Sequence, residues 1–388
     1  MDIGQIHSKE YESDAGLPGQ IAIARAPGRV HLLGEHGDPR FSSCLSSAID
    51  KYVYVAVSQR KDNSLRFFAA NSDERKRSSI TNLKYKREDR WANYIKATIQ
   101  AFASLGCLAK GLNVTVRGRV PQQVGLASSS SMEIATAVAL RAFFKVTITD
   151  RELIGRLIKE REAFFGKPAP FTDYAVILNA KADGFIIVDE HRRETRIVPV
   201  DFTGYKMLIT DSRVPRFNVE QELRQRRHDV RKGIESLFPQ KELKEINEKM
   251  FASVNPTELL SGLPETVRRR VLFVIQETRR IAETEDALKK KDFQLFSRLI
   301  FHSHEGLRDL YEVSCPEIDW LVKRGQECEG VYGARMTGTG FGGCTYALIK
   351  ESSIPEYKKR IEDYERIFGF HPIIYEVVPA QGASLISV

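Results

Sequence analysis

A polar cluster near the N-terminus has the residue types that could bind a small hydroxylated ligand. Glu35, His36 and Asp38 fall within RAPGRVHLLGEHGD (residues 25–38), directly after an apolar run. Such side chains can hydrogen-bond several hydroxyl groups of one molecule, and Arg29 adds a permanently positive guanidinium nearby. One alternative is a turn with surface charges. A metal site is another, but the cluster lacks the i, i+4 helical spacing of metalloprotease ligands.

A second stretch, VPQQVGLASSSSMEIATAVAL (residues 120–140), has the composition of an anion-binding loop. Small residues precede an Ala-rich amphipathic run, so the N–H groups of the first helical turn would converge on an anion, helped by the helix dipole. Short side chains let a phosphate approach, and serine hydroxyls can ligate Mg²⁺ or cap the helix. The alternative is a serine-rich N-cap on a core helix.

A third stretch, GARMTGTGFGGCT (residues 333–345), has five glycines in eleven residues. Glycine is entropically costly and is usually retained where the backbone must approach another group closely. A β-bulge or a tight hairpin is the alternative. The chain contains no GxxxxGK[ST] loop, and TGTGFGG lies too near the C-terminus for a dinucleotide-binding GxGxxG motif that follows an early strand.

The composition is that of an ordinary soluble globular protein, with 388 residues, 42% hydrophobic and 28% charged. This length predicts two domains. The N-terminus is polar, and no apolar run is long enough to span a membrane. The five scattered cysteines favour free thiols. We therefore expect a cytoplasmic protein.

The net charge of +8 permits anionic partners such as a nucleoside triphosphate. Basic clusters occur at residues 75–77, 224–232 and 268–270. Because aromatic residues are not interleaved with them, solvated helix faces are favoured over a nucleic-acid interface.

The elements that must position these motifs follow from hydrophobic periodicity. Strands are predicted at residues 21–26 and 30–33, around a turn at Pro27-Gly28, and at 48–57, 65–69 and 112–117, in a mostly antiparallel meander. Helices are predicted at 91–105, 129–144, 150–165 and 171–180. The loop that contains Ser128 to Ser131, called the serine loop below, therefore connects a strand to a helix. Strands at 184–188, 195–198 and 205–210 follow.

From about residue 219 the pattern becomes helix-rich, with amphipathic segments at 220–237, 265–284, 293–310 and 317–325. Strands at 331–336 and 344–349 flank the glycine cluster, and a helix at 356–367 and a strand at 373–378 follow. We therefore expect an α+β protein, with a mixed α/β domain at residues 1–200 and a helix-rich α+β domain at 201–388.

The three motifs, in this order and at these separations, resemble those of the GHMP kinase superfamily, and most closely the galactokinases. RAPGRVHLLGEHGD and ARMTGTGFGGC are similar to the first and third motifs of that family. WANYIK (residues 91–96), the segment around Ser303-His304 and YEVSCP (residues 311–316) extend the resemblance over residues 20 to 350.

The resemblance implies a two-domain fold with the active site in the cleft between domains. It also implies an ATP-dependent sugar 1-kinase that uses Mg²⁺. Asp173 would accept the proton of the sugar C1 hydroxyl, and Arg29 would keep it ionised and stabilise the transferring phosphoryl group. Glu35, His36, Asp38 and Asp173 would hold the sugar. ATP would be bound by Gly125, Leu126, Ala127, Ser128, Ser129, Ser130, Ser131, Gly338 and Gly340.

Several positions depart from the galactokinase pattern. The galactokinase phosphate loop usually has three consecutive glycines, whereas here Gln122, Gln123 and Val124 precede the single Gly125. Arg161 stands where an acidic Mg²⁺ ligand is expected, so that Ser129 and the neighbouring Glu162 are the predicted metal ligands. Two sugar-contacting positions also differ, with Pro170 in place of a glycine and Leu223 in place of a tyrosine.

These departures leave three hypotheses. The first is a 1-kinase for galactose or another sugar, since altered pocket walls imply an altered substrate. The second is a sugar- and nucleotide-binding sensor without turnover. The third, a kinase for a non-sugar alcohol, fits the Glu35-His36-Asp38 cluster poorly.

Overall fold

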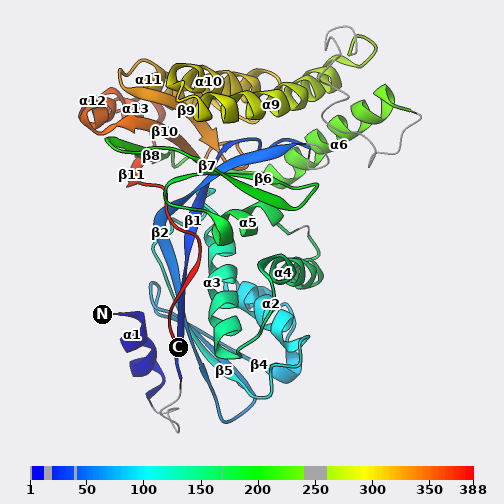
Figure 1. Cartoon of the computed structure of the whole chain (residues 1–388), viewed down its shortest axis with the longest axis vertical. Coiled ribbons are helices and arrows are strands. Elements are labelled where there is room, and N and C mark those ends of the chain that lie inside the picture. The colour runs from blue at the N-terminus through cyan, green and yellow to red at the C-terminus, as the bar shows by residue number, and fades with distance from the viewer. Residues whose placement is uncertain (1, 13–19, 39–41, 168, 240–259) are drawn as a thin grey trace.

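The structure is a computed structural model that describes residues 2–12, 20–38, 42–167, 169–239 and 260–388. The described strands form an 8-stranded sheet, built mostly from the first half of the chain, and a 4-stranded sheet in the second half. Helices cover both sheets, and the two sheets meet near the middle of the elongated molecule (Figure 1). The predicted α+β fold is therefore confirmed.

The larger sheet has the order β12-β1-β2-β5-β3-β4, with β6 paired to β2 and β7 paired to β6. Within the described residues all its strand pairs are antiparallel except β3 with β5, so the expectation of mostly antiparallel pairing is confirmed. The predicted meander was wrong, because β5 lies between β2 and β3. The strands are β1 (Ala22–Leu33), β2 (Ser43–Gln59), β3 (Ser64–Ala69), β4 (Glu74–Ser79), β5 (Leu112–Gly118), β6 (Gly184–Asp189), β7 (Glu194–Pro199) and β12 (Ser384–Ser387).

Strand β1 is continuous, and the turn predicted at Pro27-Gly28 was wrong. The two residues instead mark a register shift, because Pro27 pairs with Tyr52 whereas Gly28 pairs with Ile49. Such a bulge accommodates a proline, which has no N–H to donate. A Cβ on Gly28 would lie 2.9 Å from Val120 Cγ1, so the glycine is required by close packing.

Helices α2 (Ala92–Ala103), α3 (Ser128–Phe143), α4 (Asp150–Phe165) and α5 (Phe171–Asn179) match the predicted helices within two residues at each end. Helix α3 packs on β1 and β2 and also contacts α2 and α5. Most of its residues from Ser130 to Leu140 are buried, so the Ala-rich run is the centre of this core. Two short 3₁₀ turns, Ile80–Asn82 and Arg87–Asp89, precede α2.

The smaller sheet has the order β11-β8-β10-β9, with β8 (Tyr205–Asp211), β9 (Val331–Thr337), β10 (Cys344–Lys350) and β11 (Ile373–Val377). Its helices are α6 (Val219–Leu237), α9 (Glu265–Lys289), α10 (Phe293–Asp309), α11 (Pro316–Gln326), α12 (Ile354–Arg360) and α13 (Tyr364–Phe368), and a 3₁₀ turn spans Glu351–Ser353. The single helix predicted at 356–367 is thus two helices. After β11 the chain returns to the larger sheet, where β12 pairs with β1.

Among the described residues, no helix is long and apolar enough to cross a membrane. The five cysteines are unpaired thiols, as predicted.

Helix α1 (Ile3–Glu10), which was not predicted, packs on β2 and β5. It lies on the opposite side of the larger sheet from α3 (Figure 1). His7 is a buried residue of α1, with Nδ1 2.8 Å from Thr115 Oγ1 and Nε2 2.8 Å from Ser58 Oγ. Burial lowers the pKa of His7 from 6.5 to about 4.

The His7 pKa predicts an acid-sensitive stability. Because the unfolded state binds the proton more readily, the stabilisation is full above pH 6.5 and is lost as pH falls towards 4. Between pH 7 and pH 4.5 we expect the wild type to lose about 2 kcal/mol more unfolding free energy than His7→Gln. Urea titrations of both proteins at the two pH values measure this, and equal losses would contradict the assignment.

Candidate active site

A cavity of about 800 Å³ lies between elements of the two halves of the chain. Its walls include six of the predicted site residues, Arg29, Glu35, His36, Asp38, Asp173 and Gly338, and further residues of the second half such as Leu223, Arg227 and Tyr311. Pro170 and Leu223, the two predicted departures at the sugar side, also line it. The structure therefore brings the first motif, Asp173 and part of the third motif together.

Asp173 is the centre of a buried polar cluster at one side of this cavity. Arg29 Nε donates to Asp173 Oδ1 at 2.7 Å, and Ser130 Oγ donates to Oδ2 at 3.3 Å. Burial alone would raise the pKa of Asp173, but the charge of Arg29 and a hydrogen bond from His31 outweigh it and hold that pKa well below its usual range. Asp173 is therefore a carboxylate at neutral pH.

The serine loop lies beside the cavity rather than in its wall. Arg29 connects the two, because its Nη1 donates to Gly125 O at 2.5 Å and its backbone N–H donates to Leu126 O at 3.2 Å. Ser131 Oγ donates to Pro27 O at 2.7 Å, so the start of α3 is fastened to β1. The loop residues are thus held against the Arg29–Asp173 pair.

The serines do not act as a conventional N-cap. The N-cap residue of α3 is Ala127, whose side chain makes no cap bond and whose φ is 60°. Gln123, at a position where the galactokinase pattern has glycine, likewise has φ 63°. A left-handed backbone costs a non-glycine residue roughly 1 to 2 kcal/mol. The loop therefore holds two non-glycine residues in the left-handed conformation, which lowers its stability.

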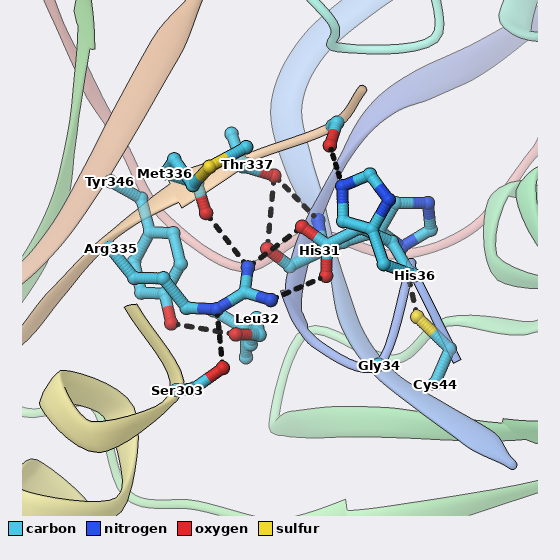
Figure 2. Close-up of polar contacts among 12 residues, drawn as sticks. His31, Leu32, Gly34, His36, Cys44, Ser303, Arg335, Met336, Thr337 and Tyr346 are labelled. Atoms are coloured by element: carbon cyan, nitrogen blue, oxygen red, sulfur yellow. Dashed lines mark hydrogen bonds and ion pairs between the residues drawn. The ribbon is translucent and has the colours of Figure 1, made fainter. Parts of the chain in front are cut away.

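Glu35 is held by a buried ion-pair network that sequence reasoning missed. Arg335 Nη1 and Nη2 donate to the two Glu35 oxygens at 2.7 and 2.8 Å. Arg335 Nε also donates to Ser303 Oγ at 2.8 Å (Figure 2). Arg335 Nη2 also lies 3.3 Å from Glu277 Oε1, and Ser303 Oγ donates to Glu277 at 2.8 Å. Burial opposes ionisation of Glu35, but Arg335 overcomes it and lowers the pKa of Glu35 to about 2.

His36 lines the cavity, and its Nδ1 has no hydrogen-bond partner among the described residues. Its Nε2 lies 3.0 Å from Gly338 O, and since a carbonyl can only accept, Nε2 carries the proton. Burial lowers the pKa of His36 to about 4, so the ring is neutral and Nδ1 is an acceptor. The ring also packs on Tyr311, with 5.2 Å between centroids. Asp38 is buried close by, with its backbone N–H donating to Ser42 Oγ at 3.2 Å.

The two glycines of the third motif that were predicted to bind ATP, Gly338 and Gly340, differ in their surroundings. Gly338 faces the serine loop, since a Cβ on Gly338 would lie 3.5 Å from Gly125 Cα. Gly340 packs away from that loop, because a Cβ there would lie 2.4 Å from Val313 O. Both have positive φ, 83° and 84°. Close packing alone thus explains Gly340, whereas Gly338 joins the serine loop to His36.

The predicted metal ligands, Ser129 and Glu162, do not line the cavity, and the described residues contain no group of three or more acidic, histidine or cysteine side chains placed to hold a metal. Ser129 lies in the first turn of α3 and is half-buried. Glu162 is exposed on α4 and accepts from Ala169 N at 3.1 Å. Arg161 instead points inward, where it pairs with the buried Glu133 of α3 and donates to Tyr174 OH at 3.2 Å.

Four residues of the site were not predicted: His31, Glu277, Ser303 and Arg335. Side chains alternate along a strand, so the pattern of β1 places His31 on the same face as Arg29, and this signal was available. Arg335 lies within the third motif, so its position in the sequence was also an available signal, but only glycines of that motif were predicted to bind a ligand. No comparable signal marks Glu277, which is one of several glutamates on the charged helix α9.

Comparison with known proteins finds family matches in both halves of the chain. Residues 93–181 match the GHMP kinases N terminal domain, residues 284–364 the GHMP kinases C terminal family, and residues 6–59 the galactokinase galactose-binding signature. The fold matches that of Lactococcus lactis galactokinase complexed with galactose at a TM-score of 0.88, with 24% identity and coverage of 99% of this chain and 100% of that chain. These matches define the class of protein as the GHMP kinases.

Two curated relatives narrow the class. Galactokinase of Thermotoga maritima is 32% identical over 366 residues, which are 93% of this chain and 99% of that protein. A relative from Treponema pallidum is 36% identical over 385 residues, 98% of this chain and 95% of its own. The chain therefore belongs to the galactokinase family, and it is a phosphotransferase, a sugar kinase of the galactokinase type.

Proposed function

We propose that the protein transfers the γ-phosphate of ATP to the anomeric hydroxyl of galactose or a closely related sugar. The Arg29–Asp173 pair carries this proposal, because it joins a polar cavity to the serine loop: Arg29 donates both to Asp173 Oδ1 at 2.7 Å and to Gly125 O at 2.5 Å. The Asp173 carboxylate, which can accept a proton, is thus linked through Arg29 to the serine loop, whose composition suits a triphosphate.

In the proposed reaction Asp173 is the general base. As the anomeric oxygen bonds to the γ-phosphorus, its O–H bond breaks and the proton moves to the Asp173 carboxylate. The bond from the γ-phosphorus to the β,γ-bridging oxygen breaks, and its electron pair leaves on ADP. Phosphoryl transfer depends mostly on positioning and charge stabilisation, so the fixed charge of Arg29 would stabilise the transferring group.

Glu35, His36 and Asp38 are proposed to bind the other sugar hydroxyls. The carboxylates accept hydrogen bonds from hydroxyl groups, and the unprotonated Nδ1 of His36 can accept another. Because Arg335 holds Glu35 through two hydrogen bonds, the direction of this carboxylate is set before the sugar arrives. A site with several fixed acceptors discriminates strongly between sugars that differ in the orientation of one hydroxyl.

The kinase family implies ATP as co-substrate, and we propose that residues 125–131 and Gly338 bind its phosphates. Helix geometry leaves the first N–H groups of α3 without intrahelical partners, and these groups would face the triphosphate. Mg²⁺ would enter with ATP and neutralise phosphate charge, with Ser129 and Glu162 as its proposed protein ligands. Ser129 fits this role because its hydroxyl makes no hydrogen bond to another described residue.

An ADP-release assay with MgATP against a panel of hexoses, hexosamines, uronic acids and pentoses tests the proposal. We expect turnover well above background with galactose or with one of its close analogues, the choice reflecting the Pro170 and Leu223 wall. Absence of turnover with the whole panel would overturn the proposal. If a sugar or ATP still raised the melting temperature, that result would favour the sensor hypothesis.

A further inference from the structure

His31 contacts Asp173, but the mechanism above assigns it no role. It lies two residues after Arg29 on β1, so both side chains project from the same face of the strand. His31 is buried, and its Nε2 lies 3.2 Å from Asp173 Oδ1, the oxygen that also receives Arg29 Nε. One oxygen of the Asp173 carboxylate therefore has two hydrogen-bond donors, and both come from β1.

The partners of His31 determine which nitrogen carries the proton. Ionised Asp173 can only accept, so Nε2 must be protonated. On the other side of the ring, Nδ1 lies 2.8 Å from Ser46 Oγ and 3.2 Å from Cys44 Sγ, both on β2, and either group can donate to it. The β1–β2 register fixes this contact, because His31 pairs directly with Ser46.

Burial is the main factor that favours the neutral ring of His31. Burial and the positive charge of Arg29 lower the pKa of His31, whereas Asp173 and Glu35 oppose them. The backbone of His31 is also fixed: Thr337 Oγ1 donates to His31 O at 2.9 Å and accepts from His31 N at 3.2 Å (Figure 2). The imidazole is therefore a rigid, neutral donor.

This contact makes the two oxygens of Asp173 inequivalent. Oδ1 receives Arg29 at 2.7 Å and His31 at 3.2 Å, whereas Oδ2 receives Ser130 alone among the described residues, at 3.3 Å. We propose that His31 is a positioning residue of the sugar kinase reaction, which holds the Asp173 carboxylate ionised and rotated so that Oδ2 is the oxygen that takes the sugar proton. This inference rests on the proposed function.

Two substitutions of His31 distinguish the effect of its hydrogen-bond donor from the effect of its side-chain volume. His31→Gln keeps an N–H donor of similar reach, whereas His31→Leu removes it and keeps the volume. In His31→Leu we expect kcat to fall by about tenfold or more, the effect of one hydrogen bond to a charged group, with both KM values little changed. The acid limb of the kcat–pH profile should also move to higher pH, because loss of a donor raises the pKa of Asp173.

His31→Gln should keep most of the wild-type kcat and the wild-type acid limb. His7→Leu is the matched control, since His7 is likewise a buried histidine, held between two hydroxyl groups, but it belongs to α1 and does not line the cavity. It should lower stability without moving the acid limb. An unmoved acid limb in His31→Leu, whatever its kcat, would overturn the proposal.

A second measurement does not depend on turnover. In ¹⁵N NMR spectra of the histidine rings, the signal absent from His31→Gln identifies His31, which should show a protonated Nε2 and an unprotonated Nδ1 at pH 7. The opposite tautomer would overturn the role of His31. By contrast, absence of ADP release by the wild type would overturn the proposed kinase function, and the NMR result would still decide the His31–Asp173 contact.

Discussion

Asp173→Asn is expected to lower kcat by roughly 10²- to 10⁴-fold, the usual contribution of a positioned general base. Asparagine keeps the shape of the side chain but cannot take the proton of the anomeric hydroxyl. The KM values for sugar and MgATP should change little, because Glu35, His36, Asp38 and the serine loop remain. The measurement is steady-state ADP release with each substrate varied in turn.

The substitution also leaves the buried Arg29 without its carboxylate, so part of any loss could come from unfolding. Urea titration of Asp173→Asn measures that part. Asp62→Asn is a suitable control: Asp62 pairs with Arg60 at 2.8 and 2.9 Å, but neither residue lines the cavity. It should leave kcat unchanged. A kcat of the wild-type order in folded Asp173→Asn would show that Asp173 is not the base.

Arg335→Leu is expected to have the largest effect on stability, a loss of about 3 to 5 kcal/mol of unfolding free energy. Arg335 is fully buried between Glu35 and Glu277, and Arg280 is the other cation that contacts Glu277. Leucine would leave Glu35 as a buried charge without a counter-ion among the residues that the structure describes. Urea unfolding monitored by circular dichroism measures the change.

Two further variants keep this prediction testable if Arg335→Leu does not fold. Arg335→Lys retains the charge but loses the paired hydrogen bonds, so it should raise the sugar KM by about tenfold while kcat changes less. Arg366→Leu removes an exposed ion pair with Asp363 and should cost less than about 1 kcal/mol. If Arg335→Leu and Arg366→Leu unfolded alike, the buried network would not be a stabilising element.

Much of the fold could be predicted from the sequence because its signals are local. The helix that carries Asp173 follows from residues 166–180 alone, and the strand–serine loop–helix order follows from residues 112–144. The error at Pro27-Gly28 shows the limit of such signals. A Pro-Gly pair usually marks a turn, but here pairing with β2 on one side and packing against Val120 on the other keep the chain extended.

The candidate site was predicted less completely, because its supporting contacts join distant parts of the chain. His31 and Asp173 are 142 positions apart, and Arg335 and Glu35 are 300 apart. Glu277 contacts Gly34 N across 243 positions. Motif spacing identified residues suited to touch a ligand, but only the packing of α9, α10 and β9 around residues 34–35 shows what holds them.

Ribosomal synthesis delivers β12 long after β1, since Arg25 and its partner Ser384 are 359 positions apart. Until residues 384–387 have been made, β1 has an unpaired edge at Ile23–Arg25, four residues before Arg29. An open strand edge is a template for pairing with other chains. The nascent chain therefore completes the sheet that carries Arg29 only after residues 384–387 have been made, and it is most exposed to misassembly before that point.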